Sequence, residues 1–329
     1  MSCQNNLKQI SLAYHNYHAA YNSLPMQMGG TKYGYRYKTT TDSDGVLTSN
    51  VLRLSSNVAI LPFMEQQSLW EQISNELPGP TSGPPAWPPM GPSPWVKTYT
   101  PWTVQVPTFL CPSDPESKLS PFAMLNYGTC HGDASDTVNT GGLDEKGAIA
   151  YFFGIPRDIW AERAAATARG VFQSRHHTSF KDIIDGTANT IMLGEFIHTA
   201  GNREVKAEIT QIVGRFNGAA ASSPKLIEME VRDPFRNRYV NLANTTDNGG
   251  EARGARCFDG KLNHNGFQTI FPPNGLNAVR SNLGGDDSIG NVPDGIFSAG
   301  SRHRGGCHVA TADGAVRFVT ESIERGDRS

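Results

Sequence analysis

The sequence predicts a mixed α+β fold with many loops, and three observations lead to that prediction. Residues 5–21 carry one apolar helix face, with side chains spaced three or four apart: Leu7, Ile10, Tyr14, Tyr17 and Tyr21. Residues 308–323 alternate around a central Asp-Gly pair, the pattern of a β-hairpin. The 329 residues include 34 glycines and 21 prolines, about one residue in six against roughly one in eight on average. This composition disfavours a doubly wound α/β enzyme.

Local patterns predict the other elements. Asn5 or Asn6 is the expected N-cap of the first helix, and Leu24-Pro25 ends it. Helices are expected where apolar residues recur at helical spacing, and strands where short apolar runs end at turn residues. The expected helices are the later part of 57–73, then 158–170 and 180–184, and the expected strands are in 104–115, 147–155 and 189–195.

The segment from Pro78 to Pro112 holds eleven prolines and three tryptophans. Proline fixes φ and removes a backbone donor, so the segment is expected to be an extended surface loop. Trp87, Trp95 and Trp102 are candidate ligand-binding residues, because exposed rings on a rigid loop stack on sugars or anchor a protein partner. The alternative, which we favour, is that the rings fold back and seal an edge of the core.

Acidic and histidine pairs offer several candidate metal ligands. Asp286, Asp287 and Asp294 stand among glycines in a loop that suits Ca²⁺, and the alternative is a solvated turn. Two pairs at i, i+3 spacing are also candidate metal ligands, His15 with His18 on a helix and Glu195 with His198 on a strand. Neither has a further ligand nearby, so a structural role is favoured for both.

The C-terminal stretch SRHRGGCHVATADGAVRF places nine residues between His303 and Asp313-Gly314. A type I′ hairpin turn, which needs positive φ at both central residues, accounts for Asp313 and Gly314 without catalysis. His303 precedes the hairpin in a glycine-rich loop, where it suits a metal ligand, a base or a backbone hydrogen bond. The sequence nominates no nucleophile beside it, so the structural role is favoured.

Charge and cysteine content exclude some classes of function and leave others open. The chain carries 29 Lys and Arg against 31 Asp and Glu, a balance that gives no support for binding nucleic acid or an anionic membrane. The cysteines form no CxxC pair, which argues against a zinc knuckle or a thioredoxin-type site. Their wide spacing is equally compatible with buried cytosolic thiols and with one or two disulfides in an exported protein.

Four segments, in this order, resemble the signature segments of the DUF1559 family, planctomycete-type prepilin-like proteins with a C-terminal H-X9-DG region. They are 2–25 (SCQNNLKQISLAYHNYHAAYNSLP), 109–115 (FLCPSDP), 182–195 (DIIDGTANTIMLGE) and 301–318. The last maps the H-X9-DG motif onto His303, Asp313 and Gly314. Family members usually start with a basic leader and a long apolar helix. Neither a signal peptide nor an apolar transmembrane run is present here, so we expect a soluble head from which that part is missing.

The resemblance implies a fold like the head of a type IV pilin or pseudopilin, with an N-terminal helix packed on an antiparallel sheet carrying large loop insertions. Residues 1–25 are then the C-terminal half of the pilin-like helix. Residues 26–329 are a β-rich head with the Pro/Trp-rich loop at 78–112 and a hairpin at 307–323. The resemblance also implies a Cys3–Cys111 disulfide, with Cys130, Cys257 and Cys307 supplying a second bridge and one free thiol.

The resemblance further implies a noncatalytic, exported protein at the cell surface, a subunit of a filament or secretion apparatus. Its partners are other pilin-like subunits or secretion machinery, and it meets a membrane only through the missing helix. One alternative is a head that binds polysaccharide or a partner protein. Another, less favoured, is a hydrolase or metalloenzyme that uses His303. No cofactor is expected apart from the candidate Ca²⁺.

Overall fold

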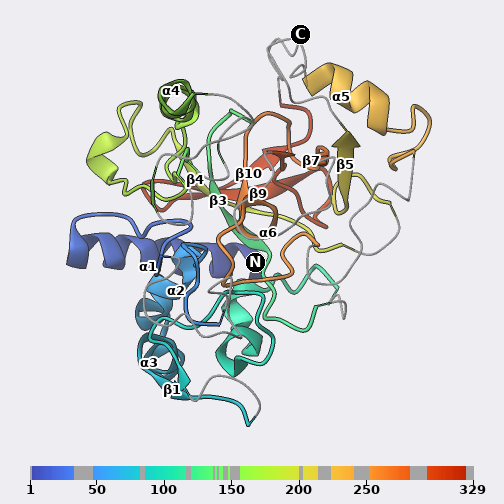
Figure 1. The fold of residues 1–329 in the computed structure, drawn as a ribbon. Coiled ribbons are helices and arrows are strands. Elements are labelled where there is room, and N and C mark those ends of the chain that lie inside the picture. Colours follow the sequence, from blue (N-terminus) through green and yellow to red (C-terminus); the bar gives the residue numbers. More distant parts are fainter. Residues whose placement is uncertain are drawn as a thin grey trace.

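The computed structural model describes residues 2–32, 47–81, 86–115, 120–135, 138, 141–143, 147–148, 156–199, 203–213, 224–240, 252–281 and 295–323. These residues form a mixed α+β fold in which a long N-terminal helix and several short helices surround a central sheet (Figure 1). The predicted α+β class is therefore confirmed, and the pilin-like arrangement stays a prediction. None of the described helices is both long enough and apolar enough to cross a lipid bilayer.

The helical elements are α1 (Ser2–Tyr21), α2 (Ser56–Ile60), η1 (Leu61–Met64), α3 (Gln67–Ser74), η2 (Thr100–Thr103), η3 (Pro107–Phe109), α4 (Arg157–Thr167), η4 (Phe180–Asp182), α5 (Pro224–Val231) and α6 (Leu262–Asn265). The strands are β1 (Leu77–Pro78), β2 (Ala86–Trp87), β3 (Tyr127–Cys130), β4 (Ile191–Glu195), β5 (Ile209–Val213), β6 (Gly266–Phe267), β7 (Asn277–Ser281), β8 (Gly295–Ile296), β9 (Gly306–Thr311) and β10 (Val316–Thr320).

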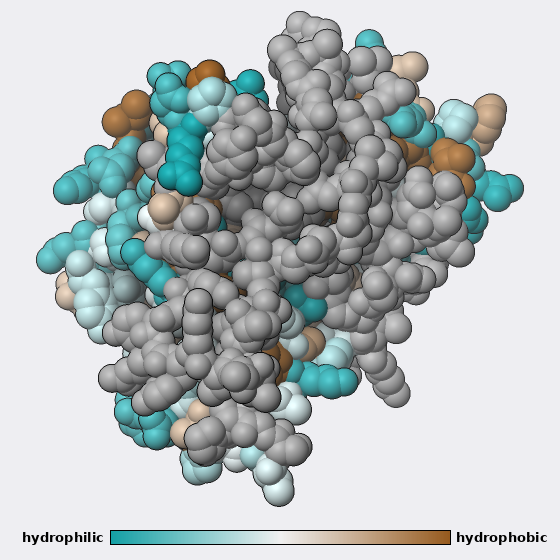
Figure 2. Space-filling model, viewed as in Figure 1, coloured by the Kyte–Doolittle hydropathy of each residue, from teal (hydrophilic) through white to brown (hydrophobic). Residues whose placement is uncertain are grey.

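The central sheet has the strand order β10-β9-β4-β3-β6. Its first four strands pair antiparallel, whereas β6 joins β3 in parallel. The register sets Tyr127 of β3 opposite Glu195 of β4, so that the last residue of β4 lies inside the sheet. A second sheet, β5-β7-β8, has its own small core with α5. Beside it, apolar atoms gather at the surface near α5, where Met229 and Phe235 are exposed (Figure 2).

Helix α1 packs one face against β4, β9 and β10 of the central sheet (Figure 1). Leu7, Ile10 and Tyr14 are fully buried, as the spacing predicts, and Tyr17 is half-buried. Tyr21, at the end of the helix, is exposed, and its ring lies tilted against that of Tyr17 instead of entering the core. The helix already begins at Ser2, so the expected N-cap at Asn5 or Asn6 is wrong.

The C-terminal hairpin β9–β10 is present, but its turn is not the expected type I′ turn. A type I′ turn needs positive φ at both central residues. Gly314 has a φ of 84°, but Asp313 does not have a positive φ. Gly314 N–H donates to Thr311 O, and Thr311 N–H donates to Ala315 O, both at 2.9 Å. These bonds define a three-residue turn that ends in a left-handed glycine, a common alternative in hairpins. Asp313 stabilises the turn by accepting from Thr311 Oγ1 at 2.5 Å and from Ala315 N–H at 3.0 Å.

Replacing Asp313 by alanine is expected to lower the free energy of unfolding by about 1 kcal/mol, because both hydrogen bonds to its carboxylate are lost. Urea unfolding followed by circular dichroism measures this loss. Asp313→Asn is the matched control, since its carbonyl oxygen accepts the same two bonds and most of the stability remains. Equal losses in the two variants would show that the carboxylate charge, and not the turn hydrogen bonds, sets the contribution.

The tryptophans of the Pro/Trp-rich loop do not form an exposed binding platform, so that interpretation is wrong. Trp87 and Trp102 are 4% and 1% exposed and belong to the main core. Their rings lie edge-on to Tyr99, at centroid distances of 5.6 and 4.8 Å. Trp95 is half-buried, with the Arg53 guanidinium 4.3 Å above its ring. The segment is not the expected extended loop, because turns and the 3-10 turns η2 and η3, each with proline in its first positions, fold it back. The apolar rings are buried because their exposure to water would cost hydrophobic free energy.

Other local expectations have mixed outcomes. The helix at 158–170 corresponds to α4 and the strand at 189–195 to β4. The expected helix at 180–184 is the single turn η4, and the strand expected in 104–115 is instead the turn η3 followed by irregular chain. Proline at the start of η3 favours a helical turn over a strand. The expected strand at 147–155 falls mostly outside the described residues.

Candidate functional site

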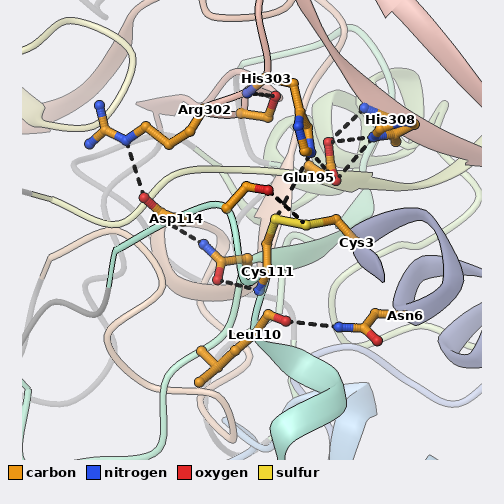
Figure 3. Close-up of a disulfide and its surroundings, with 12 residues drawn as sticks. Cys3, Asn6, Leu110, Cys111, Asp114, Glu195, Arg302, His303 and His308 are labelled. Carbon is orange, nitrogen blue, oxygen red and sulfur yellow. Dashed lines mark hydrogen bonds and ion pairs between the residues drawn. A yellow bond between two sulfur atoms is a disulfide. The ribbon is translucent and has the colours of Figure 1, made fainter. Parts of the chain in front are cut away.

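Each of the four signature segments contributes one side chain to a single cluster (Figure 3). Cys3 comes from the first turn of α1, and Cys111 from the turn after η3. Glu195 is the last residue of β4, and His303 lies in the loop before β9. One ligand atom from each of the four lies within 4.8 Å of those of the others. The segments are therefore related in space as well as in order.

The structure has the Cys3–Cys111 disulfide that the resemblance implied. Both cysteines are buried, and the bond ties the start of α1 to the head across 108 residues of sequence. Asn6 reinforces the junction, because its Nδ2 donates to Leu110 O at 2.8 Å. The helix is thus attached to the head covalently as well as by packing.

The other three cysteines do not form a second bridge, so that expectation is wrong. Cys130, Cys257 and Cys307 are all free and buried. Cys257 lies in the main core, whereas Cys130 and Cys307 lie in a small cluster with Phe267. Burial raises the pKa of each thiol, that of Cys130 to about 11. They behave as small apolar side chains that disfavour the reactive thiolate.

Glu195 is 1% exposed and gathers several hydrogen-bond donors. The backbone N–H of His308 donates to its Oε2 at 2.7 Å, and His308 Nδ1 lies 3.1 Å from the same oxygen. His303 Nε2 lies 3.3 Å from Oε1 and 4.0 Å from Cys111 Sγ. A buried carboxylate needs such partners to offset its desolvation. The histidine of the H-X9-DG motif therefore faces the carboxylate and the disulfide at once.

A second acid, Asp114, organises the turn beneath the disulfide. Its Oδ2 accepts from Asn126 Nδ2 at 2.7 Å and from the backbone N–H of His198 at 2.8 Å. Its Oδ1 accepts from Arg302 Nε at 3.2 Å, so the charges of the 109–115 and 301–318 segments pair directly. Asn126 Oδ1 in turn accepts from the backbone N–H of Cys111 at 2.9 Å. This network fixes the position of Cys111 and of the loop that carries His303.

The environment around Asp114 raises the pKa of Arg302 and lowers the pKa of His198. Burial lowers the pKa of Arg302, but the carboxylates of Glu204 and Asp114 outweigh that effect and raise it above its usual value. Burial lowers the pKa of His198, and the nearby Asp114 offsets this only in part. His198 Nε2 lies 2.6 Å from Leu125 O and its ring is turned to Asp114, whereas Glu195 faces His303 and His308. Glu195 and His198 do not converge on one site, in keeping with the structural role favoured for that pair.

The other predicted site residues lie away from the cluster. Asp313 and Gly314 form the turn at the opposite end of β9 from His303, so the motif spans one strand. His15 and His18 flank the ring of Phe180, at centroid distances of 4.6 and 4.5 Å. Trp87 and Trp102 are in the core. The candidate Ca²⁺ ligands Asp286, Asp287 and Asp294 lie outside the described residues.

The nearest hydroxyl to His303 along the sequence, that of Ser301, does not face the His303 ring. The hydroxyl of Ser301 is turned to the backbone, accepting from His303 N–H at 3.0 Å and donating to Gly306 O at 2.7 Å. A nucleophile activated by His303 would have to contact the imidazole ring. The described neighbours of that ring are instead a carboxylate, a disulfide and the ring of His308.

A cavity of about 850 Å³ opens beside the disulfide. Its lining includes Asn6 of α1, the turn residues Cys111 and Asp114, and the apolar side chains of Phe122 and Met124. Its volume lies within the usual range for small-molecule sites, roughly 300–1,000 Å³. Of the four clustered residues, Cys111 lines this space, which is large enough for a ligand.

The comparisons with known proteins give one result for the family and none for individual relatives. The family model described as "Protein of unknown function (DUF1559)" matches residues 1–326. No curated protein matches the chain, and no solved structure matches it.

Proposed function

Because the chain belongs to the DUF1559 family, we propose that it is the head of a noncatalytic, pilin-like or pseudopilin-like surface protein. In this role it is exported and is a subunit of an extracellular filament or secretion apparatus. Its partners are other pilin-like subunits or the secretion machinery. The proposal assigns α1 to assembly and the β-rich part to the outward-facing head.

The observation that carries the proposal is the arrangement of α1. One face is buried against β4, β9 and β10, while Gln4, Lys8 and Leu12 on another face are exposed. Leu12 is 59% exposed although it is apolar. A helix held on its own head by one face, with a second face free, is the arrangement that subunits packing through their N-terminal helices require.

The signature cluster supports the same role. The disulfide and the Asp114 network join α1 to the head at the start of the helix. Force transmitted along a filament through the helices reaches each head at this junction. A covalent bond between buried sulfurs resists such a load better than packing alone.

Photo-crosslinking in the organism that makes the protein tests this proposal. A photoreactive residue at Leu12 is expected to crosslink to a second copy or to another pilin-like subunit in the surface fraction. The control position is Glu162, which is exposed on α4 and lies outside the assembly face, so it is expected to give no such product. Recovery of the protein solely from the cytoplasm, as an uncrosslinked monomer, would overturn the proposal.

The cavity beside the disulfide favours a second candidate function, a head that binds polysaccharide or a partner protein. The cavity, which residues 103–112 line in part, replaces the tryptophan rings as the place of binding, since Trp87 and Trp102 are buried. The exposed lining residues Thr103, Gln105 and Pro107 offer hydrogen bonds and an apolar surface to a sugar. Saturation-transfer NMR with a panel of oligosaccharides tests it, with Thr103→Val as the variant that is expected to weaken the signal. The absence of transfer to any member of the panel would count against saccharide binding.

A further inference from the structure

Four different metal-binding side chains converge at the start of α1. Cys3, Cys111, Glu195 and His303 each bring one donor atom into a group within 4.8 Å of one another. Two thiolates, an imidazole and a carboxylate are donors that Zn²⁺ takes in four-coordinate sites. We propose that these four residues form a zinc site when the Cys3–Cys111 disulfide is reduced. The proposal does not depend on a role in filaments.

The distances around His303 already match such a site. With Zn–N and Zn–O bonds of about 2.1 Å and Zn–S bonds of about 2.3 Å, a tetrahedron places N and O roughly 3.4 Å apart and N and S roughly 3.6 Å apart. His303 Nε2 lies 3.3 Å from Glu195 Oε1 and 4.0 Å from Cys111 Sγ. The two sulfurs must separate to roughly 3.8 Å, and donor pairs that lie as far apart as 4.8 Å must approach by about 1 Å. The Cα atoms of the two cysteines are 5.0 Å apart, so side-chain rotation separates the sulfurs without moving the backbone.

The surroundings hold the donors in place. The backbone N–H of His308 donates to Glu195 Oε2, and Oε1 lies between two imidazoles, 3.3 Å from His303 Nε2 and 3.2 Å from His308 Nδ1. Such outer partners orient ligating carboxylates and raise metal affinity. Cys3 lies in the first turn of α1, where the helix dipole favours a thiolate. His303 is 23% exposed, which gives an ion a path from solvent.

The disulfide and the zinc site exclude each other, because both use the same two sulfurs. A dithiol reductant breaks the Cys3–Cys111 bond, is itself oxidised to a disulfide, and leaves two thiols. Zn²⁺ binding then displaces the two thiol protons into solvent. Reoxidation by a disulfide-class oxidant reforms the bond and releases Zn²⁺. In either state α1 stays linked to the head, by a covalent bond or by the metal.

Cobalt spectroscopy of the folded protein tests the proposal. The protein is reduced without oxygen, freed of reductant, and titrated with Co²⁺. We expect thiolate-to-Co²⁺ charge-transfer absorption and the visible bands of tetrahedral Co²⁺, saturating at one equivalent and abolished by Zn²⁺. The oxidised protein is expected to show neither signal. Near-UV circular dichroism follows the fold, and if reduction weakens that signal, Zn²⁺ is expected to restore it. Absence of the charge-transfer band, or a reduced protein that Zn²⁺ leaves unfolded, would overturn the proposal.

Variants identify the ligands. Cys111→Ser and His303→Ala are each expected to abolish the one-equivalent signal, and His308→Ala to weaken binding by about ten- to a hundredfold through Glu195. Cys257→Ser is the matched control, because that thiol lies outside the cluster, and its binding is expected to equal that of the parent protein. A signal that survives Cys111→Ser but is lost in Cys257→Ser would assign the metal to the buried free thiols and refute the site.

Discussion

Replacing Cys111 by serine is expected to lower the free energy of unfolding by about 4 kcal/mol. The disulfide closes a loop of 108 residues, and a loop of that length gives the cross-link a stabilising effect of about 4–5 kcal/mol through the entropy of the unfolded chain. The loss is expected to appear first as release of α1, because the disulfide attaches its first turn. Urea unfolding in the presence of EDTA measures it, and hydrogen exchange of the α1 amides locates it.

A double-mutant cycle supplies the control for this prediction. Cys3→Ser and Cys111→Ser break the same bond, so the double variant is expected to be about as stable as either single one. Reduction of the parent protein in EDTA is expected to produce the same loss. Losses that add across the two variants would mean that each cysteine contributes through packing and that the cross-link itself stabilises little.

The N-terminal helix and the C-terminal hairpin could be predicted from the sequence, because each has a regular pattern of apolar residues. The apolar spacing of Leu7, Ile10 and Tyr14 describes a helix face that is buried in the structure, and the alternation after His308 describes β9 and β10. Both patterns are local. The helix pattern is strong because α1 buries one face, whereas β9 is buried almost throughout and no residue of β10 is buried, so the hairpin is indicated chiefly by its Asp-Gly turn. The predicted turn type is wrong. Asp-Gly suits either a two-residue or a three-residue turn, and only the backbone φ angles distinguish the two.

The tryptophan loop shows what composition alone does not reveal. Prolines indicate an extended chain, but they say nothing about the direction of the rings between them. Trp87 and Trp102 point inward because Tyr99 and the neighbouring core supply an apolar surface, which comes from distant parts of the sequence. Whether a loop residue is buried depends on tertiary contacts, so a local sequence pattern cannot predict it.

The candidate site could be predicted only in part. His303 and Cys111 lie in segments that resemble a family. The sequence pattern pairs Glu195 only with its neighbour His198. The sheet register carries Glu195 towards β9, where His303 and His308 meet it. A carboxylate that ends a buried apolar strand was the available signal, because such a position demands a partner from another element. Which element supplies that partner depends on strand order, which the sequence alone does not determine.

Asp259 is a buried carboxylate surrounded by basic side chains, and its ion pair with Arg53 joins residues 252–265 to residues 47–55. Its carboxylate is fully buried and receives two bonds from Arg53, Nη2 to Oδ2 at 2.6 Å and Nε to Oδ1 at 3.2 Å. Arg256 Nη1 adds a contact of 3.3 Å to Oδ2. Burial alone would raise the pKa of Asp259, but Arg53, and then His264, Arg256 and Lys261, outweigh it and lower the pKa from 3.8 to about 2.

Asp259→Asn is expected to lower the free energy of unfolding by about 4 kcal/mol at neutral pH, because the buried guanidinium of Arg53 loses its counter-charge. The folded-state pKa lies below the unfolded one, so the carboxylate's stabilisation is complete above about pH 4 and is lost as the pH falls towards 2, by about 2.5 kcal/mol. The Asn variant is expected to lack that part of the acid dependence. Urea unfolding between pH 2 and 7 measures both effects.

Asp133→Asn is the control, since its pair with Arg169 is more than half exposed and contributes at most about 1 kcal/mol. If the two variants lose equal stability, or if the acid dependence survives in Asp259→Asn, the buried pair is not the element that joins these two segments of the core.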